Sequence, residues 1–159
     1  MLFVDLAGFS RLTETHGDAA AVRSGTLLRE VTERAARLHG GKVVKLLGDG
    51  AMLVFRAAQD AVSAGSFLLT SVGWNEELPP PHIGAHSGTV IERDGDLFGG
   101  TVNIAARLSS AAGPGEFVAS AEIVSALEGH PEATLNPMGD LVLKNISRRI
   151  SAFRIVPRT

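Results

Sequence analysis

Residues 45–55 have the sequence KLLGDGAMLVF, in which two apolar runs meet at Asp49 with a glycine on each side. An Asp-Gly pair between strand-like segments is a strong hairpin signal, because glycine accepts the positive φ of a tight turn. We therefore predict strands at residues 42–47 and 51–55, with Asp49 at the tip. Two interpretations of Asp49 stay open here. It is a plain turn residue, or it is a carboxylate presented by a rigid hairpin for chemistry.

The segments around this hairpin predict the rest of the core. The apolar run at residues 2–6 predicts a strand, and so does the run at 82–91. Apolar side chains at helical spacing predict amphipathic helices at 18–38 and 57–72. The order strand, helix, strand, strand, helix, strand indicates an α+β fold with a ferredoxin-like βαββαβ core. Such a core is an antiparallel sheet with helices on one face.

The remaining residues predict an additional C-terminal helix and hairpin. A helix at 101–111 follows a turn in the sequence ERDGD, and a short strand is expected at 117–119. A helix capped by Ser120 comes next. The chain then closes with a hairpin at about 138–144 and 150–156.

Composition describes a single globular domain spanning residues 1–159. Apolar residues make up 45% and charged residues 20%, and the net charge of −2 indicates no nucleic-acid partner. The chain has no cysteine, which excludes disulfides and thiolate metal sites. No apolar run approaches the ~20 residues of a membrane-spanning helix, so we expect no membrane segment and a cytoplasmic location. The first strand starts almost at Met1, which fits a domain excised from a longer chain.

Two acidic residues occupy positions that the predicted topology brings together. Asp5 closes the first strand and Asp49 lies in the hairpin turn. The first strand and the hairpin are sheet neighbours in a split βαβ fold, so their carboxylates are expected at one edge. Paired carboxylates suit Mg²⁺, which usually shares its oxygen ligands with substrate phosphates. The alternative is that each aspartate satisfies only local backbone amides.

The turn after Asp5 joins the first strand to the segment that leads into a helix. It has the sequence LAGFS and includes Gly8 and Phe9. Backbone N–H groups at such a turn are suited to face phosphate oxygens. The turn is not a P-loop, because the chain contains no GxxxxGK[ST].

The predicted helix at 101–111 has an unusually narrow polar stripe. The stripe runs through Asn103, Arg107 and Ser110, and the rest of the helix is almost entirely apolar. An ordinary solvated helix carries a wider polar face with several charges. An amide and a guanidinium one turn apart therefore favour a helix in a cleft or interface, with Arg107 suited to bind phosphate. A narrow stripe that faces water is the alternative.

The positions of lysine and histidine add two observations. Lysine occurs only at Lys42, Lys45 and Lys144, although the chain has 15 Lys and Arg residues. Lysine is expected where a compact ammonium is specifically needed. His82 and His86 are four residues apart, but on a strand with a glycine between them this spacing favours core or sheet-surface histidines over a metal site.

Six stretches together resemble the catalytic domain of class III adenylate and guanylate cyclases from one end of the chain to the other. Their order and spacing match the family, which is more specific than any single motif above. The stretches are FVDLAGFSRL (3–12), GGKVVKLLGDGAMLVF (40–55), IGAHSGTV (83–90), DLFGGTVNIAARL (96–108), GPGEFVAS (113–120) and LVLKNI (141–146).

The resemblance implies a palm-like nucleotide cyclase fold and a head-to-tail homodimer with active sites at the interface. Asp5 and Asp49 match the metal-binding aspartates of the family, which hold two Mg²⁺ or Mn²⁺ per active site. The backbone carbonyl of Leu6 is implied to help hold one ion. Lys144 lies where a lysine often meets the outer phosphates. A fused or upstream regulatory domain is a further partner that the family implies.

The resemblance also assigns the residues that bind the nucleoside and the reacting phosphate. Lys45 and Asp96 match the pair that recognises adenine in the neighbouring protomer's site, which favours ATP over GTP. Asn103 and Arg107 match the residues that position the ribose and stabilise the transition state. The expected function is therefore an adenylate cyclase that converts ATP to 3′,5′-cyclic AMP and pyrophosphate.

Three other functions remain as alternatives. The first is a catalytically silent cyclase-homology module that binds nucleotide or a partner, and the second is a guanylate cyclase. The third is a diguanylate cyclase, although the chain lacks the GG(D/E)EF signature of that family. Two departures from the family pattern leave the catalytic residues intact and bear on the strength of the dimer. LKN at 143–145 replaces the commoner LKG, and the short segment from Gly88 to Asp96 implies a reduced dimerisation arm.

Overall fold

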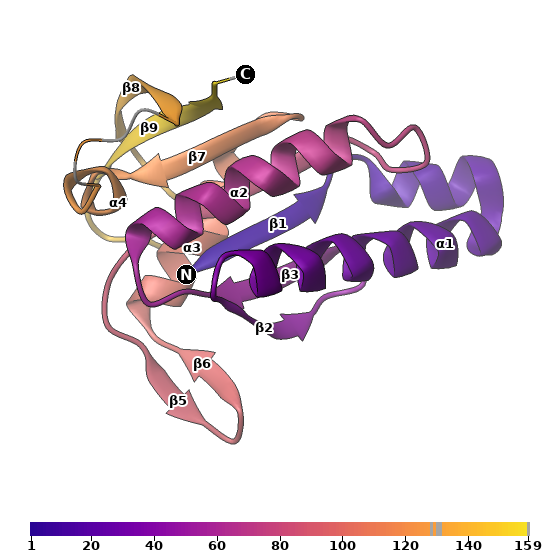
Figure 1. Ribbon diagram of the computed structural model, residues 1–159, viewed down its shortest axis with the longest axis horizontal. Coiled ribbons are helices and arrows are strands. Elements are labelled where there is room, and N and C mark those ends of the chain that lie inside the picture. Colours follow the sequence, from indigo (N-terminus) through magenta and orange to yellow (C-terminus); the bar gives the residue numbers. More distant parts are fainter. Residues whose placement is uncertain (128, 130–131, 159) are drawn as a thin grey trace.

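The computed structural model describes residues 1–127, 129 and 132–158, so the last residue of the predicted domain lies outside the described residues. Its principal sheet has helices packed on both faces (Figure 1). The elements are β1 (Leu2–Leu6), α1 (Phe9–Leu38), β2 (Lys42–Leu46), β3 (Gly50–Val54), α2 (Ala58–Gly73), β4 (Pro81–Ala85), β5 (Ile91–Arg93), β6 (Asp96–Phe98), α3 (Gly100–Ala111), β7 (Glu116–Ser120), α4 (Ala121–Ser125), β8 (Ala133–Leu141) and β9 (Ile150–Pro157).

The described sheet has seven strands in the order β2-β3-β1-β4-β7-β9-β8, and β5 and β6 form a separate two-stranded hairpin. β1 is central to the predicted core, because it pairs antiparallel with both β3 and β4. The strand order β2-β3-β1-β4 confirms the ferredoxin-like arrangement of the core. β7 then pairs parallel with β4, and β9 and β8 complete the sheet as the C-terminal hairpin.

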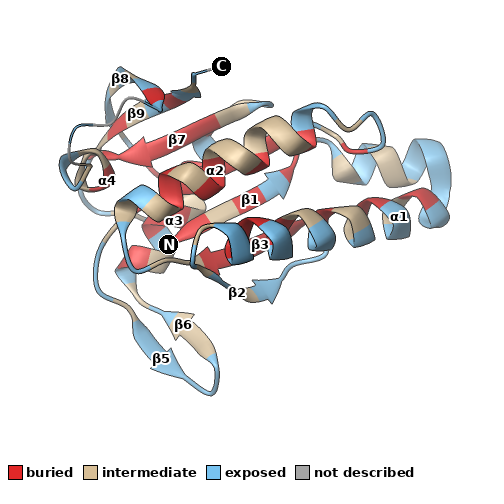
Figure 2. Cartoon of the chain, in the orientation of Figure 1, coloured by how far each residue is buried: buried red, intermediate tan, exposed pale blue. Residues whose placement is uncertain are grey.

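The expectation that the two core helices lie on one face of the sheet is confirmed for α1 and α2, whereas the additional helix α3 packs on the opposite face. Leu2 and Val4 of β1 belong to the large buried cluster beneath α1 and α2, and Figure 2 shows buried residues along the facing sides of these elements. Phe3 points to the opposite face, where it packs in a cluster with Ala105 of α3. Because side chains alternate along a strand, β1 is covered by protein on both sides.

Several element boundaries differ from the sequence expectations. α1 begins at Phe9 rather than at residue 18, and its two halves meet at a kink where Gly17 has φ 82° and ψ 175°. The strand predicted at residues 2–6 is β1. The strand predicted over residues 82–91 is β4, which ends at Ala85 before the chain enters the β5–β6 hairpin. β8 starts at Ala133 and includes Pro137, which an edge strand tolerates because its free side needs no N–H donor.

The β5–β6 hairpin projects from the body of the domain (Figure 1). Its two-residue turn is formed by Asp94 and Gly95, which have φ values of 53° and 78°. Positive φ at both positions is the requirement of a type I′ turn, and Asp-Gly is a preferred sequence for it. The predicted ERDGD turn is therefore confirmed as the tip of this projecting arm.

No helix in the described part of the chain is both long and apolar enough to span a membrane.

α3 approaches the sheet closely at Gly84 of β4. A Cβ atom on this residue would lie 2.1 Å from the Ser109 nitrogen and 2.6 Å from the Ala105 carbonyl oxygen, both backbone atoms of α3. We expect Gly84→Ala to reduce the free energy of unfolding by about 1–3 kcal/mol or more, because α3 must move away. Urea denaturation measures this change.

Gly73 at the end of α2 provides the matched control. A Cβ atom there would meet nothing within 4 Å. Gly73→Ala is therefore expected to be neutral or to stabilise by up to ~1 kcal/mol, as helical glycine replacements do. Equal effects of the two substitutions would contradict the close packing of α3 on β4.

Candidate active site

Asp5 and Asp49 meet at the end of β1, as the topology predicts. Asp5 lies opposite Gly50 in the β1–β3 register, and the N–H of Leu6 donates to the carbonyl oxygen of Asp49 at 2.9 Å. Partial burial raises the pKa of Asp5, and the negative charge of Asp49 raises it further. The two carboxylates are thus held close enough to repel each other, which is the arrangement that a divalent cation relieves.

The two glycines around Asp49 have different structural roles. The positive φ that the hairpin needs occurs at Gly48, with φ 76°, rather than at the Asp-Gly pair that predicted the turn. Gly50 is the first residue of β3, and a Cβ atom there would lie 2.7 Å from the Val4 carbonyl oxygen and 3.1 Å from Asp5 Oδ1. Gly48 therefore shapes the turn, and Gly50 leaves room for the Asp5 carboxylate.

The turn after β1 leads directly into α1. Gly8 is the N-cap residue with φ 68°, and no side chain caps the first turn of the helix. Phe9 packs against the main core, which fixes the start of the helix. The N–H groups of Leu6 and Ala7 donate to the carbonyl oxygens of Asp49 and Pro80. Phosphate binding by the N–H groups of Gly8 and Phe9 therefore stays a prediction. The side chain of Leu6 is buried, so its backbone is what the site can use.

Lys45 and Asp96 form an ion pair although 51 residues separate them. Lys45 Nζ lies 2.8 Å from Asp96 Oδ2, and the N–H of Leu97 donates to Asp96 Oδ1 at 2.8 Å. The hydrogen bond from Lys45 is the main reason that the pKa of Asp96 is lowered. The pair links β2 to the tip of the projecting hairpin, because Asp96 directly follows the turn of Asp94 and Gly95. A positive donor and a negative acceptor therefore lie side by side.

Asn103 and Arg107 of α3 face a pocket together with Lys144. The pocket has a volume of about 380 Å³, and its lining residues are Asn103, Ala106, Arg107, Lys144, Asn145 and Ile146. Within the described residues, neither Arg107 nor Lys144 forms an ion pair. The third residue of the predicted stripe, Ser110, instead donates to the Ala106 carbonyl oxygen at 3.2 Å. A pocket with two unpaired cations and no acid is suited to an anion.

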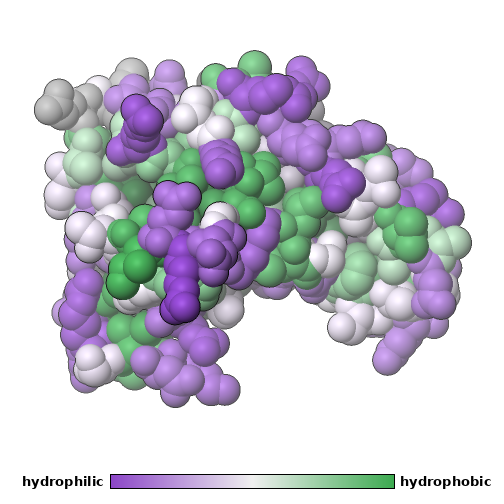
Figure 3. Space-filling view, turned by 90° about the horizontal axis from the view of Figure 1, so that it is seen from below, coloured by the Kyte–Doolittle hydropathy of each residue, from purple (hydrophilic) through white to green (hydrophobic). Residues whose placement is uncertain are grey.

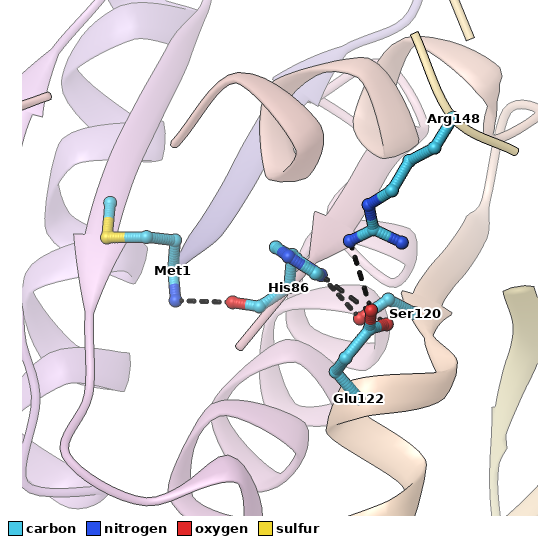
Figure 4. A network of polar contacts seen from close by, with 5 residues as sticks. All are labelled: Met1, His86, Ser120, Glu122 and Arg148. Atoms are coloured by element: carbon cyan, nitrogen blue, oxygen red, sulfur yellow. Dashed lines mark hydrogen bonds and ion pairs between the residues drawn. The ribbon is translucent and has the colours of Figure 1, made fainter. Parts of the chain in front are cut away.

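The loop that carries Lys144 is fastened by a polar network that sequence reasoning missed (Figure 4). Arg148 Nη2 donates to Glu122 Oε1 at 3.1 Å, and Glu122 Oε2 lies 3.9 Å from His86 Nδ1. The same Nδ1 lies 2.7 Å from Ser120 Oγ. Ser120 is the N-cap residue of α4 as predicted, but its hydroxyl contacts His86 rather than capping the helix. Nothing in the sequence spacing indicated this network.

Both histidines form hydrogen bonds within the fold, although only His82 lies on β4 and His86 follows the end of the strand. His86 is buried, and burial lowers its pKa. His82 is paired with Asp5 in the β1–β4 register, and its Nδ1 lies 2.6 Å from the Ala112 carbonyl oxygen. The hydrogen bond to a carbonyl requires Nδ1 to carry the proton. His82 thereby connects the end of α3 to the strand beside Asp5.

Comparisons with known proteins identify the family of the chain. The family model described as "Adenylate and Guanylate cyclase catalytic domain" matches residues 1–155. A proposed adenylate cyclase of Rhizobium meliloti is 30% identical over 99% of this chain and 28% of its own length. An adenylate cyclase of Streptomyces coelicolor is 36% identical over 69% of this chain and 29% of its own length. The chain thus spans less than a third of either relative.

Solved structures show the same fold. A crystal structure of an adenylate/guanylate cyclase/hydrolase from Silicibacter pomeroyi has a TM-score of 0.83 and 30% identity, covering 99% of this chain and 95% of that one. The adenylyl cyclase CyaB of P. aeruginosa has a TM-score of 0.81 at 23% identity, over 99% and 93% of the two chains, which supports the fold alone. By its matched domain, its relatives and its fold, this chain belongs to the adenylate and guanylate cyclase catalytic domain family.

Proposed function

We propose that residues 1–159 form a single adenylate cyclase catalytic domain that converts ATP to 3′,5′-cyclic AMP and pyrophosphate. The observation that carries the proposal is the pairing of Asp5 with Asp49 at the end of β1, in a chain of the cyclase family. Two carboxylates that repel each other are poorly explained as turn residues. They are well explained as ligands of a cation.

The residues present fit two Mg²⁺ or Mn²⁺ ions. Among the described residues, no group of three or more His, Cys, Asp or Glu side chains forms a metal cage. Asp5 and Asp49, with the backbone carbonyl of Leu6, would therefore hold the ions together with substrate phosphates and water, as Mg²⁺ prefers. Bound ions would lower the pKa of the ribose 3′-hydroxyl and stabilise charge on the departing oxygens.

The other residues of the site act on the nucleotide itself. The 3′-oxygen attacks the α-phosphorus, its proton passes to solvent, and the bond to the β-phosphate oxygen breaks as pyrophosphate leaves. Asn103 orients the ribose, and Arg107 neutralises charge that grows on the α-phosphoryl group. Lys144 and the backbone N–H groups of Gly8 and Phe9 hold the outer phosphates.

Lys45 and Asp96 support ATP as the substrate. The Lys45 ammonium donates to an adenine ring nitrogen, and the Asp96 carboxylate accepts from the exocyclic amine. Guanine presents an oxygen where adenine has that amine, which leaves the Asp96 carboxylate opposed to another acceptor. The ion pair already holds both groups together without ligand, so the base site is preorganised.

Two copies of the chain complete each site. The pocket of Arg107 and Lys144 is lined by neither Asp5 nor Asp49, so the acids and the cations are presented separately. The β5–β6 arm exposes Ile91 and Phe98, which are register partners with exposed fractions of 66% and 48%. Figure 3, seen from the side of this arm, shows apolar surface and a hollow beside the projecting end of α1. These features support a head-to-tail homodimer.

Cyclase activity is tested by incubating the protein with Mn²⁺ and ATP or GTP and separating the products by chromatography. We expect more cyclic AMP from ATP than cyclic GMP from GTP. We also expect the specific activity to rise with protein concentration as dimers form. Absence of cyclic AMP at high protein concentration would refute the proposed activity and favour a catalytically silent cyclase-homology module. Equal turnover of GTP would refute the assignment of ATP.

Mixing two inactive variants tests the shared site. Asp49→Asn and Arg107→Ala are each expected to lose activity by at least about 10³-fold, because every site of either homodimer is defective. A mixture should recover about a quarter of the wild-type activity, since half of the dimers are mixed and each has one intact site. A mixture as inactive as its components would contradict a site formed by two copies.

Replacing the Asp5 carboxylate is expected to have separate effects on stability and on metal binding. Its raised pKa means that the folded protein binds more protons than the unfolded one between the two pKa values, so stability falls as pH rises through that window. At neutral pH the cost is present in full. Asp5→Asn should therefore melt at the same or a higher temperature than wild type. Mn²⁺ should raise the melting temperature of wild type but not that of Asp5→Asn.

Asp140→Asn provides the matched control, because this residue is an exposed aspartate of β8. Its melting temperature should respond to Mn²⁺ as wild type does. Stabilisation of Asp5→Asn by Mn²⁺ to the wild-type extent would place the cation elsewhere.

Base recognition gives a third prediction. Lys45→Met removes the donor and leaves Asp96 without its ion-pair partner, so kcat/KM for ATP should fall by roughly ten- to a hundredfold, as for loss of a hydrogen bond to a charged group. Lys42→Met, an exposed lysine of the same strand, should leave kcat/KM within about twofold. Equal losses in both variants would indicate a general effect of charge.

A further inference from the structure

Asn145 is the one lining residue of the cationic pocket that the family resemblance does not explain. It occupies the position where LKN departs from LKG, directly after Lys144. Its φ is 62°, in the left-handed region. Glycine adopts this conformation most easily, and asparagine is among the few other residues that tolerate it. The backbone therefore permits asparagine here, but it does not require a side chain.

The side-chain amide of Asn145 has no hydrogen-bond partner among the described residues. It lines the same pocket as Asn103, Arg107 and Lys144, and no acidic residue lines that pocket. Two amides and two cations thus share one pocket of about 380 Å³. An amide N–H next to two unpaired cations is positioned to donate to the same anion that they attract.

The loop around Asn145 is held at both ends. On one side, Leu143 is 6% exposed and packs in the cluster that contains Ile104 and Leu108 of α3. On the other side, Arg148 is bound to Glu122 of α4, as Figure 4 shows. The N–H of Ile146 donates to the Leu143 carbonyl oxygen at 3.1 Å and closes the turn. A fixed turn loses little conformational entropy when its side chain binds a ligand.

We propose that Asn145 is a phosphate-binding residue whose side-chain N–H₂ donates to the outer phosphates of the nucleotide and to the pyrophosphate product. The inference rests on the proposed function, because it places the triphosphate end of ATP between α3 and the loop of Lys144. It adds to that function a second neutral donor, beside Asn103, in a pocket whose other polar groups are cations. Replacing the usual glycine with asparagine then contributes a ligand contact at a smaller cost in backbone strain than most other side chains would incur.

Titration calorimetry with inorganic pyrophosphate tests the proposal without requiring catalysis. Asn145→Gly keeps the left-handed backbone and removes only the amide, so pyrophosphate should bind about five- to tenfold more weakly than to wild type. Asn145→Asp keeps the size and the tolerance of this backbone but adds a negative charge, and it should weaken binding further. In turnover assays, Asn145→Gly should raise KM for ATP more than it lowers kcat.

Asn136→Gly is the matched control, since Asn136 is an exposed asparagine of β8 that does not line the pocket. Its affinity for pyrophosphate should equal that of wild type, and thermal melting should show that all variants are folded. Unchanged pyrophosphate binding by Asn145→Gly, or no binding by wild type, would overturn the proposal. Loss of binding in a protein that forms no cyclic AMP would instead refute the proposed function and retain the phosphate site.

Discussion

The antiparallel pairing of β1 with β3 is the constraint on which the candidate site depends. It places Asp5 opposite Gly50 and brings the backbone of Leu6 to Asp49. A Cβ atom at position 50 would lie 2.7 Å from the Val4 carbonyl oxygen and 3.1 Å from Asp5 Oδ1, so a side chain there would displace the strand or the Asp5 carboxylate. The repulsion between the two carboxylates lowers the stability of the fold locally, and the buried core around β1 offsets this loss. Functional sites often carry such local destabilisation.

The opposite face of the sheet carries α3 and the cationic pocket. α3 packs closely on Gly84, and Asn103 and Arg107 of its polar stripe line the pocket. Arg107 and Lys144 remain without acidic partners in the described structure, although the chain has more acids than bases. Unpaired cations on one surface and crowded carboxylates on another are each electrostatically incomplete. A nucleotide with its metal ions, bound between two copies, would neutralise both sets.

The polar network from His86 to Arg148 links these surfaces to the fold. A buried histidine, a serine and a partly exposed ion pair connect the end of β4 and the start of α4 to the loop of Lys144 and Asn145. Such networks are directional, so they define one loop conformation where apolar packing alone would allow several. This network uses a group that could otherwise cap a helix, because the Ser120 hydroxyl contacts His86 and leaves the N-terminus of α4 without a side-chain cap.

The sequence by itself determined the order of the core elements, the β2–β3 hairpin, the pairing of Asp5 with Asp49 and the polar stripe of α3, because periodicity and turn chemistry are local properties. It did not determine that α3 covers the opposite face, that β4 ends at Ala85, or that Gly50 is needed for space rather than for its φ. The Lys45–Asp96 contact and the His86–Glu122–Arg148 network join residues far apart in the chain, and only the tertiary structure decided them. Side chains that meet across different elements leave no periodic signal, since their spacing is set by packing and not by the repeat of a helix or strand.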